Sequence, residues 1–482
     1  MLKLIKNISI YSLGNILLTG ISFILLPLYT RVLSPSDYGQ LELLYLIAGI
    51  LVIFFGFNIS SGYNRIYFTN KNINSRRTLF MTSQAFNIFC SAVGVLIIFI
   101  NIDYFSKLIL NFEQGNYFLK LITIATVTDV LAQVPISNLR NRDKAWSYIQ
   151  VSIITLVFTI FFTIYFIVFI DLGVVGVLYG KILGSLFSLI YLYYLTWGEF
   201  HFRVSNGMLL SMLSFSIFLI PSNLSSLILN MSNRFFLSEY ESFEDVGQFS
   251  LGVKIAAVIP ILITEPVKKA FVPYVFDLAD QPHKCTALLS DIIRLFFTGI
   301  SIFVLIISIF ANDLVYLMAS DSFQGSSSVV FIMSFSNLLL GTAAIVVLAI
   351  HITKKTWIVT LIWVFSSLLN IVLNILLIPG YGKMGAAFAT LLSILFILIF
   401  YIIASKKVFP LTIPYRSMLK VGFLLISFNY MGRYITFDIW TNIFLKTCFV
   451  LLYVTVLIYF TRIIKSEEIK LLKNYLNVKF FK

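Results

Sequence analysis

The chain has 482 residues, of which 59% are hydrophobic and only 12% are charged. Soluble domains are about half apolar and about a quarter charged, so this composition excludes a water-soluble globular protein. It also excludes a disordered chain, which has low hydrophobicity. The long, continuous apolar runs instead predict helices that cross a membrane, because about 20 apolar residues span a bilayer as a helix.

The apolar runs follow one another along the whole chain. They predict an all-α polytopic membrane protein with fourteen transmembrane helices. The expected spans are 8–30, 38–57, 78–101, 117–136, 149–170, 173–195, 208–230, 246–268, 289–311, 329–350, 357–378, 384–404, 417–436 and 441–463.

The basic residues predict the orientation of these spans. With a cytoplasmic N-terminus, most of the 35 Lys and Arg residues fall in cytoplasmic loops and in the C-terminal tail. Cytoplasmic loops of membrane proteins are enriched in Lys and Arg, so both termini are predicted to be cytoplasmic. The net charge of +14 is then a signal of topology, and no nucleic-acid partner is expected. Residues 463–482 have two interpretations, a basic amphipathic helix on the inner leaflet or a frayed tail.

The sequence lacks the spacing of a catalytic or metal site. The three His residues, His201, His283 and His351, lie in separate loops, and the three Cys residues form no metal-ligand pattern. The predicted loops are also too short to hold a catalytic domain. We therefore expect a protein that is not an enzyme and that needs no cofactor or metal.

Sequence markers recur at a nearly constant spacing in the two halves of the chain. The segment from Arg31 to Gly39 ends the first span, and the segment from Arg234 to Gly247 ends the seventh. Lys-x-Trp precedes both the fifth and the eleventh spans, and Gly-x-x-Gly opens both the sixth and the twelfth. These markers predict an internal repeat of six spans.

Because six is an even number, both copies of this repeat have the same orientation in the membrane. This is a parallel repeat, whose copies are related by an axis along the membrane normal. The predicted domains are two six-helix bundles, 1–206 and 207–405, followed by two extra helices and the basic tail in 406–482. Bundles of this kind face each other across a central cavity, and alternating access rocks one against the other.

Three short motifs mark the junctions after the first, fourth and seventh spans. They are Leu28-Tyr29-Thr30-Arg31-Val32-Leu33 with Tyr38-Gly39, Leu139-Arg140 with Lys144 and Tyr148, and Asn233-Arg234-Phe235 with Val246-Gly247-Gln248-Phe249. Taken in this order, they resemble bacterial polysaccharide flippases of the Wzx type, and the resemblance covers the whole chain in length and number of spans. That family often has Asp where this chain has Asn233.

The resemblance implies a fourteen-helix fold of the multidrug/oligosaccharidyl-lipid/polysaccharide exporter superfamily in the bacterial cytoplasmic (inner) membrane. It implies a flippase that moves undecaprenyl-diphosphate-linked oligosaccharide units to the outer leaflet for O-antigen (lipopolysaccharide), capsule or exopolysaccharide biosynthesis. The implied partners are this lipid-linked oligosaccharide, membrane lipids, a polysaccharide polymerase and a chain-length regulator. Two alternatives stay open, a flippase for lipid-linked peptidoglycan precursors and an ion-coupled multidrug antiporter of the same superfamily. Coupling of transport to H+ or Na+ is also left open.

A flippase for such a lipid would use basic residues inside its spans to bind the anionic diphosphate, because cations in a wet cavity offset the loss of water. Lys181 lies eight residues past Gly173, and Lys254 lies eight residues past Val246, so both have a similar predicted depth, one in each half. Each has an alternative role in a buried ion pair. Asp129, the one deep acid, has two interpretations, ion coupling or an ion pair with Lys181.

Lys181 also adjoins a small-residue face, Gly176-x3-Gly180-x3-Gly184, which predicts close packing on a neighbouring helix. Arg31 and Arg234 occupy matching repeat positions at the predicted outer mouth. They are expected either to guide the diphosphate or to anchor helix ends.

Polar side chains recur at helical spacing in the first and seventh spans. Asn15 and Thr19 in the first span, with Ser222 and Asn230 in the seventh, are candidates for a sugar path. A packing seam between helices is the alternative. Pro221 predicts a kink in the seventh span.

Overall fold

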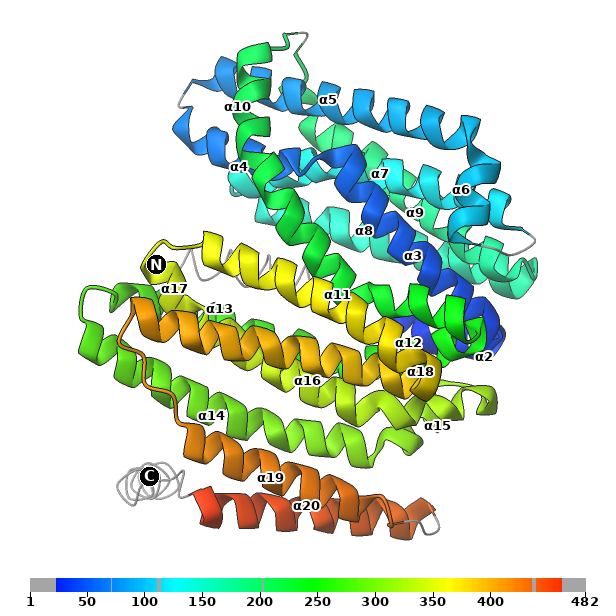
Figure 1. Ribbon diagram of the computed structural model, residues 1–482. Helices are drawn as coiled ribbons and strands as arrows, with labels where there is room; N and C mark the ends of the chain where they lie inside the picture. Colours follow the sequence, from blue (N-terminus) through cyan, green and yellow to red (C-terminus); the bar gives the residue numbers. More distant parts are fainter. Residues whose placement is uncertain (1–22, 71, 111–113, 202, 436–438, 462–482) are drawn as a thin grey trace, which may run out of the picture. The chain divides into compact units, whose positions relative to one another are not determined.

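The computed structural model describes residues 23–70, 72–110, 114–201, 203–435 and 439–461. Every regular element in these ranges is a helix, and none of the described residues forms a strand (Figure 1). The prediction of an all-α polytopic membrane protein is confirmed.

Eleven helical stretches of the described chain are long and apolar enough to cross a membrane. In the second to fourteenth predicted spans the described residues are mainly helical, although some spans contain two or three successive helical elements, and the eleventh and twelfth together form one long stretch, Trp357–Val408. The first predicted span, 8–30, lies mostly outside the described residues, and the predicted tail helix at 463–482 lies wholly outside them. The total of fourteen therefore stays a prediction.

The chain forms two compact units. Unit 1 consists of Met1–Ser250, Met318–Phe323 and Ser367–Ala386, and unit 2 consists of Leu251–Leu317, Gln324–Ser366 and Ala387–Lys482. This division follows the contacts within each unit. The repeat and the predicted bundle boundaries stay predictions.

Unit 1 contains most of the N-terminal half of the chain. Its helices are α2 (Leu26–Val32), α3 (Pro35–Gly56), α4 (Ile59–Thr69), α5 (Ile73–Ile100), α6 (Ile102–Ile109), α7 (Gly115–Asn141), α8 (Ala145–Ile164) with η1 (Tyr165–Phe169), α9 (Gly173–Thr196) with η2 (Trp197–Glu199), α10 (Asn206–Ser216), η3 (Ile217–Leu219) and α11 (Ile220–Tyr240).

The other elements belong to unit 2 or contribute residues to both units. Those of unit 2 are η4 (Pro260–Thr264), α13 (Glu265–Asp277), α14 (Pro282–Ile309), α16 (Ser327–Val346), α17 (Leu348–Ile352), α19 (Tyr415–Gly432) and α20 (Ile439–Thr461). Those that contribute to both are α12 (Phe243–Ala256), α15 (Ala311–Met318), η5 (Asp321–Ser326) and α18 (Trp357–Val408).

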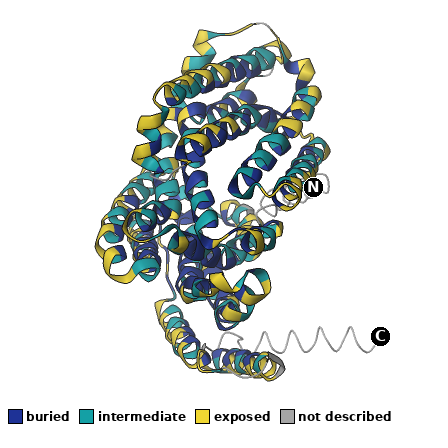
Figure 2. Ribbon diagram, turned by 90° about the vertical axis from the view of Figure 1, so that its right-hand side faces the viewer, coloured by how far each residue is buried: buried dark blue, intermediate teal, exposed yellow. Residues whose placement is uncertain are grey.

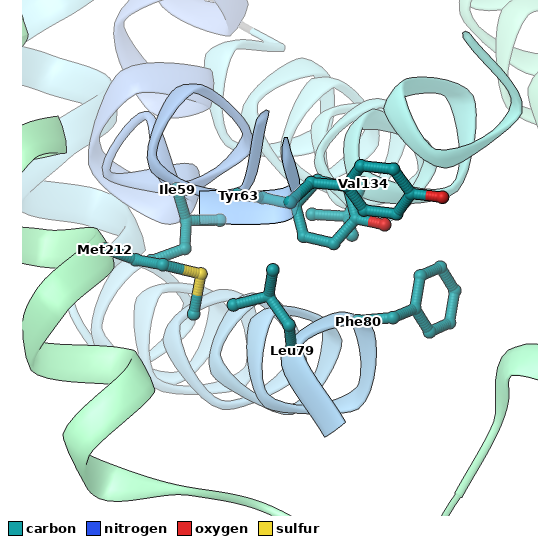
Figure 3. Packing of buried hydrophobic residues seen from close by; sticks show 7 residues of the cluster. Ile59, Tyr63, Leu79, Phe80, Val134 and Met212 are labelled. Atoms are coloured by element: carbon teal, nitrogen blue, oxygen red, sulfur yellow. The ribbon is translucent and has the colours of Figure 1, made fainter. Parts of the chain in front are cut away.

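Helix α7 is central to the packing of unit 1, where it contacts α3, α5 and α9. One end of α7 joins α4, α5 and α10 around a buried apolar cluster (Figure 3). The labelled members of this cluster are Ile59, Tyr63, Leu79, Phe80, Val134 and Met212. Burial of side chains of this size contributes about 1.5–3 kcal/mol each, so the cluster stabilises this end of the unit.

The helix predicted to kink at Pro221 has a break in its α-helical geometry just before this residue. The α-helical geometry of α10 ends at Ser216, a 3-10 turn follows at Ile217–Leu219, and α11 begins at Ile220 with Pro221 in its first turn. Proline is tolerated at this position because its missing N–H has no partner in the first turn of a helix.

Two glycines at matching repeat positions have the same backbone conformation. Gly173 begins α9 with φ of +51°, and Gly382 interrupts α18 with φ of +53°. Glycine is favoured in this left-handed region because it has no Cβ atom. The interruption at Gly382 separates the eleventh predicted span from the twelfth, so this marker has the same structural role in both halves.

The helices expose many large apolar side chains. Figure 2 shows exposed residues along helices throughout the described chain, and Phe169, Phe218 and Tyr459 are among the most exposed large apolar residues. Soluble monomers rarely carry apolar surface on this scale. These surfaces are suited to contact with lipid.

Candidate functional site

Lys181 and Asp129 form an ion pair in unit 1. The Lys181 Nζ atom of α9 lies 3.1 Å from Asp129 Oδ2 of α7. The lysine ammonium also lies 5.3 Å from the centre of the Tyr45 ring of α3, within the range of a cation–π contact. The side chains of Lys181 and Asp129 are 24% and 38% exposed. This pair is therefore open to an incoming group at the junction of three helices.

Close packing of α9 on α8 positions Lys181. A Cβ atom added to Gly180 would lie 2.2 Å from Thr163 Oγ1, and one added to Gly184 would lie 2.2 Å from Thr159 Oγ1. The predicted small-residue face is confirmed. Lys181 follows Gly180 by one residue, so it is rotated off this face, and its ammonium reaches α7.

A second polar contact joins α7 and α9 beside the ion pair. The hydroxyl groups of Thr128 and Ser185 are 2.7 Å apart. Thr128 adjoins Asp129, and Ser185 is one helical turn from Lys181, so this contact holds the register of the two helices at the ion pair.

Arg234 lies in a buried ion pair with Glu42. Arg234 Nε of α11 donates to Glu42 Oε2 of α3 at 3.1 Å, and the two side chains are 5% and 2% exposed. The guanidinium also donates to the Asn230 carbonyl oxygen through Nη1 at 3.1 Å. The partners are 192 residues apart, and the sequence analysis did not suggest this pairing. Of the two roles expected for Arg234, the geometry favours anchoring of helix α11.

The two copies of one repeat marker cap helices in the same way. Asp37 N–H donates to Ser34 Oγ at the start of α3, and Asp245 N–H donates to Ser242 Oγ at the start of α12, both at 3.1 Å. Each serine hydroxyl also donates to the aspartate carboxylate three residues later. The residue types and the hydrogen bonds therefore recur together, which supports a structural repeat.

These two helix starts also contact each other reciprocally. A Cβ atom on Gly39 would lie 1.9 Å from the Phe243 carbonyl oxygen, and one on Gly247 would lie 2.0 Å from the Pro35 carbonyl oxygen. Each glycine thus packs on the backbone four residues before the other. The contact has the symmetry of a two-fold axis between the repeat markers, and all four residues belong to unit 1.

We expect Gly39→Ala and Gly247→Ala to destabilise this contact by at least about 1–3 kcal/mol, the usual cost of overpacking. The obstructing atoms are backbone oxygens, which cannot rotate away as a side chain can. Thermal unfolding of the purified protein in detergent would measure the loss. Gly422→Ala in α19 is the matched control, because no atom lies within 4 Å of its added Cβ. Equal melting temperatures for all three variants would contradict the prediction.

A buried amide cluster between α11 and α18 was not predicted from the sequence. Asn374 Nδ2 donates to Asn233 Oδ1 at 2.8 Å and to Asn370 Oδ1 at 3.1 Å, and Ser232 Oγ donates to Asn370 Oδ1 at 2.9 Å. All four side chains are buried in unit 1. The spacing of Asn370 and Asn374, one helical turn apart in an apolar run, is the signal that could have revealed it. The four side chains are neutral, so the cluster links α11 to α18 without charge.

Unit 1 also contains a large apolar cavity of about 950 Å³. Helices α3, α5, α6, α7, α11 and α18 line it, and among the described lining residues only Cys90 and Ser232 have polar side-chain atoms. Its aromatic wall includes Phe54, Phe89 and Phe235. Such a cavity suits an apolar chain far better than a polar solute.

The other predicted site residues differ in their exposure and in the unit to which they belong. Lys254 is half-buried in α12 and belongs to unit 2, and Arg31 is exposed in the last turn of α2. In α11, Ser222 is half-buried, and the exposed Asn230 donates its amide to the Ser226 carbonyl oxygen at 2.7 Å. Asn15 and Thr19 lie outside the described residues.

A metal centre is not formed by the described part of the chain, where no three His, Cys, Asp or Glu side chains come close enough to hold a metal ion. The candidate site in unit 1 contains ion pairs, amides and an apolar cavity.

Comparison with known proteins identifies the family. The sequence profile described as polysaccharide biosynthesis protein matches residues 4–279, more than half of the chain. The chain belongs to this family. The resemblance noted in the motifs is thus confirmed at the level of the family.

Two proteins of Haemophilus influenzae are relatives of this chain. A protein of the Lsg locus is 22% identical over 331 residues, which cover 67% of this chain and 79% of the relative. An uncharacterized membrane protein is 24% identical over 285 residues, 58% of this chain and 67% of the relative.

Solved structures show which fold the family member has. The lipid II flippase MurJ in an inward closed conformation has a TM-score of 0.71 at 14% identity, with 93% of this chain and 98% of MurJ covered. An inward-facing MATE multidrug transporter of the MOP superfamily has a TM-score of 0.67 at 15% identity, with 80% and 94% covered. The predicted exporter-superfamily fold is therefore confirmed.

Proposed function

We propose that this protein is a flippase for undecaprenyl-diphosphate-linked oligosaccharide units, which it moves across the bacterial cytoplasmic membrane for surface polysaccharide biosynthesis. The observation that carries the proposal is the apolar cavity of about 950 Å³ among the spanning helices of unit 1. A polyprenyl chain would bury its carbons there at about 0.8 kcal/mol per CH₂ group. The family, whose members act in polysaccharide biosynthesis, supports a sugar as the cargo.

The diphosphate would bind at Lys181. In the absence of substrate, Asp129 neutralises this lysine at 3.1 Å and keeps it oriented between α7 and α9. Exchange of the carboxylate for a diphosphate would preserve the charge balance of the site and would avoid an unpaired cation in a low-dielectric region. Lys254 in unit 2 and Arg31 are proposed as further cations on the route of the diphosphate.

The sugar units would pass the polar side chains of α11, Ser222 and Asn230, together with Asn15 and Thr19. Transport needs binding and release without a chemical step, so we propose no enzymatic activity and no cofactor. Lipid and lipid-linked oligosaccharide are the proposed ligands. A polysaccharide polymerase and a chain-length regulator would act on the exported product.

The fold similarity to a lipid II flippase favours one second candidate, the transport of lipid-linked peptidoglycan precursors. Both substrates would contain a polyprenyl diphosphate, so the proposed cavity and cation suit either one. A cationic drug would instead need free acids in the site, whereas Asp129 is paired with Lys181.

Purified full-length protein in lipid vesicles would separate these functions. We expect it to translocate a fluorescent undecaprenyl-diphosphate-linked oligosaccharide, measured by access of an external lectin, and to leave lipid II and ethidium in place. Translocation of lipid II alone would support the second candidate and overturn the first, and ethidium transport alone would overturn both.

Photocrosslinking would test the apolar cavity directly. Phe89 lines the cavity with 67% exposure, whereas Phe169 is 76% exposed and does not line it. A benzoylphenylalanine at position 89 should capture the polyprenyl chain of the fluorescent substrate at least about fivefold more than one at 169, because lipid contact is common to both positions but the cavity is not. Equal capture would contradict this use of the cavity.

The proposed location is the cytoplasmic membrane with both termini in the cytoplasm. Reporter fusions after Asn70, Lys144 and Lys482 should report the cytoplasm, because their loops and tail are rich in Lys and Arg, and a fusion at Gln114 should report the outside. An outside signal at Lys482 would overturn the number of spans.

A further inference from the structure

We propose that unit 2 carries a separate polar site, which binds a sugar unit bearing a carboxylate. The pocket lies where the ends of α14, α16 and α19 meet α15 and α20, and it has a volume of about 330 Å³. This volume is within the range of about 300–1,000 Å³ for small-molecule sites. The place of the pocket in glycan transport rests on the function proposed above, whereas its binding chemistry does not.

A buried lysine gives the pocket its fixed charge pattern. Lys446 of α20 is 5% exposed, and its Nζ atom lies 2.5 Å from Asp313 Oδ2 at the start of α15. With its amide oxygen turned toward the ammonium, Asn442 accepts a second hydrogen bond from Lys446 Nζ at 3.2 Å and donates to the Ile435 carbonyl oxygen. The charges of Lys446 and Asp313 cancel each other. The Asp313 side chain is 39% exposed, so part of its carboxylate can still accept a hydrogen bond from a ligand.

Asn429 supplies an unused polar group to the same pocket. Its residue is 4% exposed and lines the pocket, and neither its amide nitrogen nor its amide oxygen is a fully buried atom without a partner, so the amide faces the pocket space without a hydrogen bond to another described residue. Because the amide faces the pocket, it is available to form hydrogen bonds with a ligand that enters it. The amide offers two donors and one acceptor.

The serines of the pocket offer acceptors. Ser308, Ser327 and Ser328 each donate their hydroxyl proton to a backbone carbonyl oxygen of the preceding turn, at 2.6, 3.1 and 2.8 Å. Their remaining lone pairs can accept hydrogen bonds from a ligand. Donors and acceptors are therefore mixed around one space, which suits a polyol, since each sugar hydroxyl both donates and accepts.

Arg433 selects for an anionic sugar. It is exposed at the C-terminal end of α19, lines the pocket, and forms no ion pair with another described residue. Since Lys446 and Asp313 cancel, Arg433 leaves the pocket with one positive charge. A guanidinium can bind a carboxylate through two parallel hydrogen bonds, and Ile309 and Phe331 provide an apolar wall for the sugar ring.

The predicted topology places this pocket on the outer side of the membrane, because the connections that follow α14 and α19 are predicted outer loops. A sugar bound there would have completed translocation. The site would then hold either the sugar of the lipid-linked substrate before release or a free glycan outside the cell.

Calorimetric titration of the full-length protein in nanodiscs would test the site, with glucuronate, glucose and acetate as probes. We expect glucuronate to bind about tenfold more tightly than glucose and acetate not to bind, because the site needs both hydroxyl groups and a carboxylate. Arg433→Gln should lower the glucuronate affinity about tenfold without affecting glucose, and Asn429→Ala should weaken both. Arg416→Gln, an exposed arginine of the same helix outside the pocket, is the matched control and should bind as wild type.

Absence of glucuronate binding, or equal loss in the Arg433 and Arg416 variants, would overturn the site. Competition experiments would show which of the two ligands the pocket binds. If only a uronate-containing lipid-linked glycan displaces glucuronate, the ligand is the transported substrate. If the free glycan displaces glucuronate, the ligand is the glycan outside the cell. The vesicle assay separates this proposal from the flippase function. If wild-type protein binds glucuronate but moves no lipid-linked sugar, the flippase proposal fails and the pocket stands.

Discussion

Removal of either charge from the Arg234–Glu42 ion pair should destabilise the protein by about 3–5 kcal/mol, the usual cost of leaving a buried charge without its partner. The two side chains are 5% and 2% exposed, so water cannot replace the missing partner. We expect Glu42→Ala and Arg234→Ala to lower the melting temperature of the purified protein sharply and to reduce its amount in the membrane.

Replacement of both charges should restore most of this stability. Buried ion pairs are often no more stabilising than apolar side chains of similar volume, so the double variant Glu42→Leu/Arg234→Met is expected to unfold closer to wild type than either single variant. Lys268→Gln is the matched control, because the Lys268–Glu265 pair is 40% and 48% exposed and exposed pairs contribute about 0–1 kcal/mol. If the single substitutions of Glu42 and Arg234 reduce stability no more than Lys268→Gln does, water reaches the Arg234–Glu42 pair and the prediction is wrong.

The outcome of this test bears on the role of Arg234 in transport. A variant that is unstable cannot be used to assign substrate binding to the missing side chain. The double variant removes this ambiguity, since it lacks the guanidinium but should fold. Normal export by the double variant would show that Arg234 anchors α11 to α3 and does not bind the diphosphate.

Features that depend on neighbouring residues could be predicted from the sequence. Composition and apolar run length predicted the helices, Pro221 predicted a break, and the glycine spacing in the sixth span predicted the seam between α8 and α9. In each case a few consecutive residues contain the whole signal, because a helix is closed by hydrogen bonds within four residues.

Features that join distant segments were mostly not predictable. Glu42 and Arg234 are far apart in sequence, and many basic residues were equally possible partners for the acid. The amide cluster had an even weaker signal, because Asn370 and Asn374 are uncharged and do not stand out in an apolar run. The Lys181–Asp129 ion pair was one of the two interpretations that the sequence allowed for Asp129. A carboxylate deep in a membrane needs a cationic partner, and few basic residues were predicted at the depth of Asp129.

The markers of the predicted repeat illustrate both cases. Its markers were visible as residue types at matching positions, but their purpose was not. The structure shows that Ser34 and Ser242 cap the helices that start with them, and that Gly39 and Gly247 allow these helix starts to touch. The two copies of this marker pack on each other: Gly39 contacts the backbone before Gly247, and Gly247 contacts the backbone before Gly39. Each copy needs a glycine at this position because a Cβ atom would collide with the other copy.

Substitution of Lys181 by Gln should reduce the export of surface polysaccharide by at least about tenfold, while the protein still inserts in the membrane. A glutamine keeps the length and the polarity of the side chain but cannot neutralise a diphosphate. A loss of about 1.4 kcal/mol of charge stabilisation corresponds to this tenfold change, and a partly exposed cation can supply that much. Lys181→Arg should be milder because it keeps the charge, and Lys107→Gln in α6, an exposed lysine outside the cavity, is the matched control.

The same substitution of Lys254 tests whether this lysine also contributes to export. Comparison of the two single variants with the double variant then shows whether their effects add, as the effects of independent residues do. Asp129→Asn should retain the cation but leave it unpaired, so we expect slower release of substrate rather than loss of binding. Normal export by a well-expressed Lys181→Gln/Lys254→Gln protein would rule out the electrostatic mechanism, and the flippase function would then depend on the apolar cavity alone.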